Sequence, residues 1–211
     1  MAQHKFTTAA FTLPLIFAAS LANADGDNND NNQGNNNRNQ ISFNMVSANP
    51  CVSQATARVR VVSTGTAEDM TIHARGLPAN TDFDFFVIQV PKAPFGLSWY
   101  QGDVQTDEDG EADQHFRGRF NIETFIVNPA NMPVPAPQVH HNAFPDALAS
   151  PPTAPVHTYH LGLWFNSPAD ARKAGCPATV TPFNGEHNAG IQVLNTSNFP
   201  DLQGPLFNLS P

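Results

Sequence analysis

The histidines are the residues in this sequence with the clearest capacity for transition-metal chemistry. The chain contains eight, and imidazole rings bind copper and zinc. His140 and His141 are adjacent in an irregular segment, where both rings are able to converge on one ion. Glu186 or His187 from another loop would complete the ligand set. The sequence thus offers a candidate metal site at His140, His141 and His187, and the competing interpretation is surface or hydrogen-bonded histidines.

Aromatic side chains offer a second kind of site, in which rings stack against a sugar. The sequence has 16 Phe but only two Trp and two Tyr, and phenylalanines on strands mostly pack in a core. Trp99, Tyr100 and Trp164 carry larger amphipathic rings of the kind that β-sandwich carbohydrate-binding modules use. These three residues are therefore a candidate stacking platform for a ligand.

The run from Asp103 to Asp113, DVQTDEDGEAD, places six carboxylates around Gly110 and is a candidate calcium site. It does not follow the EF-hand pattern, because aligning Gly110 with the sixth position of that loop puts Gln105 at the first and Phe116 at the twelfth. Asp109-Gly110 fits a type I′ hairpin turn better, since both residue types tolerate the positive φ angles that this turn requires.

Nucleophilic catalysis has a weaker basis in the sequence. Gly96-Leu97-Ser98-Trp99-Tyr100 begins like the G-x-S-x-G motif of hydrolases, but Tyr100 stands where the second glycine belongs. The strand, turn and helix that surround this motif are missing as well. A secreted hydrolase is kept as an alternative function without assigned catalytic residues.

Cys51 and Cys176 are the only cysteines, and they lie near opposite ends of the predicted domain. In an oxidising compartment such a pair predicts one disulfide. The bridge would close a loop of about 125 residues, which the chain-entropy model values at about 4 to 5 kcal/mol. A reactive thiol or a metal-thiolate pair is the alternative, with His187 the only nearby residue at ligand spacing.

The first 24 residues read as a cleaved secretory signal peptide. Lys5 precedes an apolar stretch from Phe11 to Ala19, which is interrupted by a proline and too short to span a bilayer, and Ala22-Asn23-Ala24 matches a cleavage site. Residues 25–40 contain no aliphatic or aromatic side chain and predict a disordered Asn/Asp-rich leader. Residues 41–211 are expected to form one domain.

Charge argues against nucleic acid as a partner. The whole chain has a formal net charge of −8, and without Lys5 nine basic residues face 18 acidic ones, which gives −9. Proteins that bind nucleic acids cluster Lys and Arg to neutralise phosphates, whereas the basic residues here are scattered along the sequence. The balance is typical of a soluble exported protein.

Apolar residues recur with a period close to two from Ile41 onward, which predicts β-strands. Residues 83–90, FDFFVIQV, form a continuous apolar run expected of a central strand buried on both faces. His157 and His160 lie in another such run, on opposite faces of the expected strand, and therefore do not chelate. The other candidate strands lie at 57–62, 70–75, 97–104, 112–117, 120–127, 157–166 and 191–195.

Two segments depart from this pattern. Residues 128–156 hold eight prolines and predict a long loop, a feature that is usually functional or disordered. Residues 167–175 predict the one helical turn, with Ser167 as the N-cap, Pro168 at the first position and Gly175 at the end. About nine short strands in one domain indicate an all-β, antiparallel β-sandwich, with a closed barrel as the alternative.

The stretches from Gly76 to Val127 and from His157 to Pro200 resemble a family of uncharacterised exported bacterial proteins. The resemblance covers most of the chain after the leader and implies a bacterial, exported protein, but no activity and no site residues. The piece GLPANTDFDFFV also resembles a segment of immunoglobulin-like and fibronectin-like modules, with Phe83 where those often have tyrosine. That resemblance implies an immunoglobulin-like sandwich.

These observations predict a secreted or periplasmic β-sandwich with a binding or structural role and without enzymatic activity. Its ligand is an unidentified extracellular or periplasmic molecule, no cofactor is required, and no stable membrane span remains after cleavage. A copper-, zinc- or calcium-binding protein and a secreted hydrolase are the alternatives.

Overall fold

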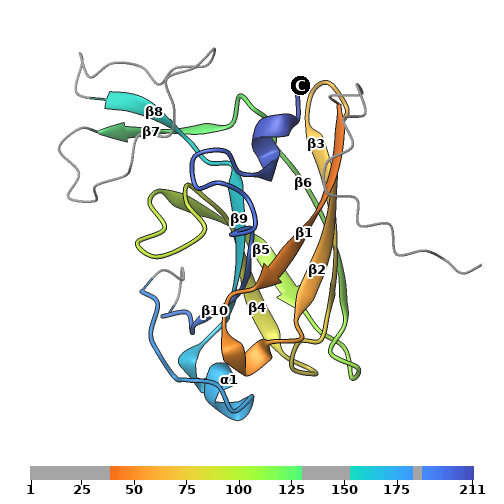
Figure 1. Cartoon of the computed structure of the whole chain (residues 1–211), viewed down its shortest axis with the longest axis vertical. Coiled ribbons are helices and arrows are strands. Elements are labelled where there is room, and N and C mark those ends of the chain that lie inside the picture. The colour runs from red at the N-terminus through yellow and green to blue at the C-terminus, as the bar shows by residue number, and fades with distance from the viewer. Residues whose placement is uncertain (1–38, 130–152, 183–186) are drawn as a thin grey trace, which may run out of the picture. The chain divides into compact units, whose positions relative to one another are not determined.

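The structure, a computed structural model, describes residues 39–129, 153–182 and 187–211 (Figure 1). The predicted signal peptide, nearly all of the predicted leader and the middle of the Pro-rich segment lie outside these residues. The strands are β1 (Gln40–Ser47), β2 (Thr56–Ser63), β3 (Glu68–Arg75), β4 (Asp82–Ile88), β5 (Ser98–Gln105), β6 (Ala112–Gly118), β7 (Phe125–Pro129), β8 (Thr153–His157), β9 (His160–Phe165) and β10 (Gln192–Asn195). The helices are η1 (Pro50–Val52), α1 (Pro168–Lys173) and η2 (Pro205–Asn208).

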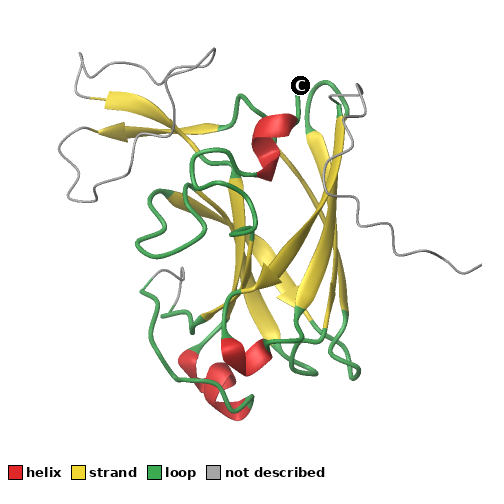
Figure 2. Ribbon diagram, in the orientation of Figure 1, coloured by secondary structure: helices red, strands yellow, loops and turns green. Residues whose placement is uncertain are grey.

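Eight of these strands form a single antiparallel sheet, which confirms the predicted all-β antiparallel class. Their order is β5-β4-β9-β10-β1-β2-β3-β6, and β7 pairs with β8 in a separate two-stranded sheet. The large sheet bends at β1. Residues 40–46 of this strand pair with β2, whereas only its last two residues, Val46 and Ser47, pair with β10. The bend divides the sheet into two halves, β1-β2-β3-β6 and β10-β9-β4-β5 (Figure 2).

The two halves share one hydrophobic core between their inner faces. Met45, Val59 and Ile72 from the first half are buried in the same cluster as Phe85 and Leu163 from the second. This core forms because alternate residues on each strand point to the same side. Their burial is the main favourable term in the folding of such a sheet.

The edge strands β5 and β6 lie against each other, so that the sheet is nearly closed. The Phe116 ring of β6 stacks on Phe85 of β4 at a centroid distance of 5.3 Å. Gly102 of β5 permits this approach, because a Cβ atom at that position would lie 2.7 Å from the Phe116 ring. The structure thus has features of both predicted alternatives. One sheet folds over itself into two packed halves, as in a sandwich, and its two edges nearly meet, as in a barrel.

Two local predictions are confirmed in detail. Six of the seven residues of β4 are buried, as its continuous apolar run indicates, and the strand lies between β5 and β9. The helix α1 begins after Ser167, whose hydroxyl accepts a hydrogen bond from the Asp170 N–H, and Pro168 occupies its first turn. Among the described residues no helix is long and apolar enough to cross a membrane.

Two predicted strands have different bounds in the structure. Residues 120–127 were expected to form one strand, but residues 119–124 are a loop and β7 begins at Phe125. Residues 157–166 were also expected to be continuous, but β8 ends at His157 and β9 begins at His160. In both places side-chain hydrogen bonds to backbone groups replace the regular ladder.

The turn at Asp109-Gly110 is present, but its predicted type is wrong. Gly110 has φ +75°, whereas Asp109 is not among the residues with positive φ, which a type I′ turn requires at both positions. The Asp107 carboxylate accepts hydrogen bonds from the N–H groups of Asp109 and Glu111 at 3.0 and 2.9 Å. This local bonding holds Asp109 in the ordinary region of φ and leaves only Gly110 to reverse the chain.

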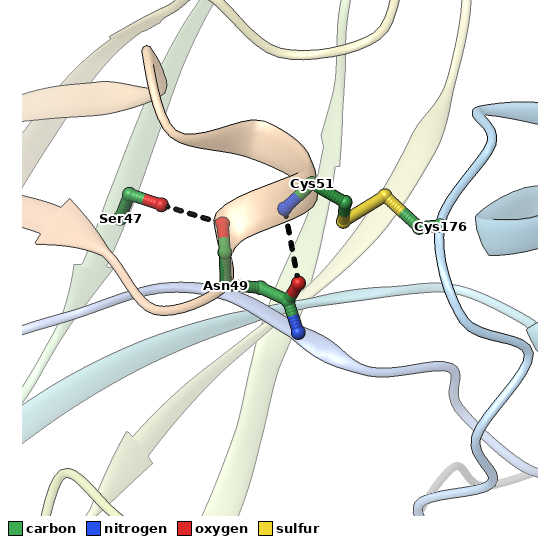
Figure 3. Close-up of a disulfide and its surroundings, with 4 residues drawn as sticks. All are labelled: Ser47, Asn49, Cys51 and Cys176. Carbon is green, nitrogen blue, oxygen red and sulfur yellow. Dashed lines mark hydrogen bonds between the residues drawn. A yellow bond between two sulfur atoms is a disulfide. The ribbon is translucent and has the colours of Figure 1, made fainter.

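The disulfide between Cys51 and Cys176 is present and joins the two halves of the sheet (Figure 3). Cys51 lies in η1, directly after β1, and Cys176 follows α1. The Asn49 side chain accepts a hydrogen bond from the Cys51 N–H at 3.1 Å, and the Ser47 hydroxyl donates to the Asn49 carbonyl at 2.9 Å. These bonds hold the short helix that presents Cys51.

His160 anchors the C-terminal segment to the sheet. Its ring is fully buried, and its Nε2 donates to the Pro200 and Asp201 carbonyls at 3.1 and 3.2 Å. The other ring nitrogen, Nδ1, then accepts a hydrogen bond from the Thr196 hydroxyl at 2.8 Å. The oxygen of this hydroxyl accepts in turn from the Leu161 N–H. Burial lowers the pKa of His160 to about 4, although the bonds to the carbonyls act in the opposite direction.

We expect the free energy of unfolding to fall by about 3 kcal/mol as the pH decreases from 6.5 to 4. The unfolded chain takes up the His160 proton near the ordinary pKa of 6.5, whereas the folded protein resists it until about 4, so that acid favours unfolding. Urea unfolding at a series of pH values measures this. His160→Gln should flatten the dependence, and exposed His115→Gln should not. If the free energy of unfolding depends on pH in the same way in all three proteins, His160 is not the group responsible for the loss of stability in acid.

Candidate functional site

A pocket lies beside the start of β5. It has a volume of about 590 Å³, within the range typical of small-molecule sites. Three segments line it: the first half of β5, the loop between β6 and β7, and the first residue of β7. We call it the Trp99 pocket. Its lining residues are Trp99, Gln101, Arg119, Asn121, Glu123, Thr124 and Phe125.

Two aromatic rings form the apolar part of the Trp99 pocket. Trp99 is half-buried and packs against the main core, and its indole N–H donates to the Gln101 side chain at 3.2 Å. Phe125 is 52% exposed, and its ring makes an edge contact with His157, with centroids 6.2 Å apart. Both rings are therefore held by neighbours while part of each surface stays open to solvent.

The loop of residues 119–124 is held by a buried carboxylate from β3. Glu68 is fully buried and accepts hydrogen bonds from the Phe120 N–H and the Asn121 side-chain amide, both at 2.7 Å. The Arg119 guanidinium lies 3.7 Å from the same carboxylate and is 49% exposed. Glu68 therefore fixes the polar side of the pocket and orients Arg119.

Further hydrogen bonds within the loop complete its shape. The Asn121 N–H donates to the Thr124 hydroxyl at 3.0 Å, and the Glu123 N–H donates to the Asn121 side chain at 2.9 Å. From outside the loop, the Tyr159 hydroxyl donates to the Ile122 carbonyl at 2.6 Å. The loop thus keeps a defined conformation without a strand ladder, which favours a preformed site.

The chemistry of the pocket suits a ligand that is apolar on one face and polar at its edges. Trp99 and Phe125 provide ring surfaces for stacking. Arg119 donates hydrogen bonds, the Glu123 carboxylate accepts them, and Gln101 has groups of both kinds. Pyranose rings have this combination of an apolar face and peripheral hydroxyl groups.

The three aromatic residues predicted as one platform do not lie together. Trp99 lines the pocket, but Tyr100 follows it on a strand and points to the other face, where its hydroxyl donates to Asp103 at 2.7 Å. Trp164 is fully buried and makes edge contacts with Phe86 and Phe95 at centroid distances of 5.4 and 5.1 Å. Trp164 is therefore closed off from solvent in this structure, and of the three predicted residues only Trp99 lines the pocket.

The predicted metal ligands are only partly described. His140 and His141 lie outside the described residues, and His187 is exposed. Within the described part of the chain, no group of three or more His, Cys, Asp or Glu side chains is placed to hold a metal ion. A metal site that includes His140 and His141 stays a prediction.

Sequence reasoning missed most of the Trp99 pocket. The sequence pattern places Phe125 in a predicted strand at 120–127 and gives no role to Glu68. The signal was present in the segment RGRFNIET (117–124), which combines an aromatic residue with closely spaced polar side chains. Without the pairing of β3 with β6, nothing in the sequence connects this segment with Glu68.

Comparison of the chain with known proteins found no relative. The chain matches no protein-family model, no curated protein and no solved structure.

Proposed function

We propose that this chain is an exported, non-enzymatic binding protein that takes a carbohydrate in the Trp99 pocket. The observation that carries the proposal is the presence of two partly exposed aromatic rings and several hydrogen-bonding side chains in one pocket of about 590 Å³. A preformed pocket of this composition favours recognition of a ring-shaped polar ligand. The hydrogen-bonded loop that lines it supports binding without a large ordering cost.

Export is part of the same proposal. The N-terminal 24 residues have the pattern of a signal peptide, and a disulfide is compatible with an oxidising compartment such as a periplasm or the cell exterior. The resemblance to exported bacterial proteins and to immunoglobulin-like modules supports the same location and a sandwich that presents its loops for binding.

We expect Trp99→Ala to weaken oligosaccharide binding at least about tenfold, which corresponds to about 1.4 kcal/mol. The substitution removes the largest stacking surface of the pocket. Isothermal titration calorimetry with cellohexaose, chitohexaose and maltohexaose measures the dissociation constants of the processed protein. The tightest binder of this panel is then used for the variants.

Tyr100→Ala is the matched control, because Tyr100 is the adjacent aromatic residue but lies on the opposite face of β5. It should change the dissociation constant by less than about twofold. Equal effects of the two substitutions would place the ligand elsewhere. A wild-type protein that binds none of the three oligosaccharides would contradict the assignment of a carbohydrate ligand.

A further inference from the structure

The outward face of β2, β3 and β6 gathers basic residues that lie far apart in the sequence. Arg58 and Arg60 are exposed on β2, Arg75 is exposed on β3, and Arg117 is exposed on β6. They share one side because the alternate residues of these strands point into the core. We call this surface the basic face. It also contains His73, His115, Asp69 and Asp113.

Strand register brings the charged residues of the basic face into rows. Arg58 is opposite His73, which is opposite Asp113. Arg60 is in the row of Thr71 and His115. Neighbouring strands lie about 4.8 Å apart, so that these side chains form one continuous charged surface rather than isolated groups.

The two carboxylates of the basic face are occupied by its histidines and by Arg117. Asp69 lies 3.6 Å from both His115 and Arg117, and Asp113 contacts His73. Within the described part of the chain, no carboxylate forms an ion pair with the three remaining arginines. These are Arg58, Arg60 and Arg75.

The charge of this face is opposite to that of the whole chain. Four arginines and two aspartates give the face a net charge of +2 with neutral histidines, whereas the chain has a net charge of −8. Guanidinium groups pair with sulfate and carboxylate groups through two parallel hydrogen bonds. The face is therefore complementary to a polyanion.

Surface composition argues against two classes of polyanion. The exposed large hydrophobic residues of the described chain are Tyr100, Phe125, Val180 and Leu202, and none of them lies on β2, β3 or β6. The face thus lacks the aromatic rings on which single-stranded nucleic acids stack and the apolar residues that insert into a membrane surface. Charge and hydrogen bonding alone remain to bind the partner.

We propose that the basic face binds an anionic polysaccharide through its sulfate or carboxylate groups. The site is formed by Arg58, Arg60 and Arg75, with Arg117 at its margin. Because the face lies on β2, β3 and β6, it does not share a residue with the Trp99 pocket. The basic face and the Trp99 pocket are therefore two separate proposed sites.

A heparin oligosaccharide is the probe that tests this proposal, with the exported and processed protein titrated in 50 mM salt. We expect Arg58→Gln combined with Arg60→Gln to raise the dissociation constant at least about tenfold, since two charge-assisted contacts are lost. We also expect wild-type binding to weaken as salt is added. Trp99→Ala should leave heparin binding unchanged, which separates this site from the pocket.

The matched control removes two positive charges from α1 instead, by Arg172→Gln and Lys173→Gln. It should change the dissociation constant by less than about twofold, because these residues lie outside the basic face. Thermal unfolding of each variant establishes that it is folded. Equal losses in both double variants, no heparin binding in 50 mM salt, or tighter binding to duplex DNA or anionic vesicles of matched charge would each overturn the proposal.

Discussion

Replacing Cys51 and Cys176 together with alanine is expected to lower the free energy of unfolding by about 4 to 5 kcal/mol. The disulfide closes a loop with a sequence separation of 125 residues, so that its loss frees a large part of the unfolded chain. It also joins η1 at the end of β1 to the segment after α1, and thereby connects the two halves of the sheet. A loss of this size is a large fraction of the stability of a typical domain.

Urea unfolding of the wild type, the reduced wild type and the double variant measures the effect. The reduced wild type should lie close to the double variant, because both lack the covalent link. A free-thiol assay on denatured, unreduced protein should find no thiols. Two thiols per chain, or a double variant within about 1 kcal/mol of the oxidised wild type, would contradict the structural role of the bridge.

Glu68→Ala is expected to cost about 3 to 5 kcal/mol, because it removes the acceptor from two buried donors and the ion-pair partner from Arg119. The Phe120 N–H and the Asn121 side-chain amide both donate to this carboxylate. Without it, the loop of residues 119–124 loses its attachment to β3. The variant should therefore also lose oligosaccharide binding in the Trp99 pocket.

Glu68→Gln separates the hydrogen bonds from the charge. Glutamine keeps one acceptor oxygen in nearly the same shape, so that about half of the stability loss is expected. Glu108→Ala in the exposed turn between β5 and β6 is the control, and should change stability by less than about 0.5 kcal/mol. Urea unfolding of the three variants measures the differences. If Glu68→Ala behaves like Glu108→Ala, the buried carboxylate does not hold the pocket.

Elements with strong local signals could be predicted from the sequence. The apolar run of β4 and the Ser167 cap of α1 depend on neighbouring residues, and both are confirmed. The break between β8 and β9 could not be predicted, because a contact between residues distant in the sequence accompanies it. His157, for example, contacts the Thr124 carbonyl, 33 residues away.

The two proposed binding surfaces could not be predicted from the sequence for the same reason. The arginines of the basic face are scattered in the sequence and become neighbours only through the register of β2, β3 and β6. Likewise, Glu68 meets Asn121 across 53 residues. The burial of Trp164 could not be predicted, because the loop that brings Phe95 over it carries no sequence pattern that indicates such a contact.

The most direct measurement is an NMR titration of the tryptophan indole N–H groups with the oligosaccharide that binds most tightly. The chain has two tryptophans, of which Trp99 lines the pocket and Trp164 is fully buried. We expect the Trp99 indole signal to shift in proportion to saturation while the Trp164 signal stays in place. Saturable binding that leaves the Trp99 signal unmoved, or that moves only Trp164, would contradict carbohydrate binding in the Trp99 pocket.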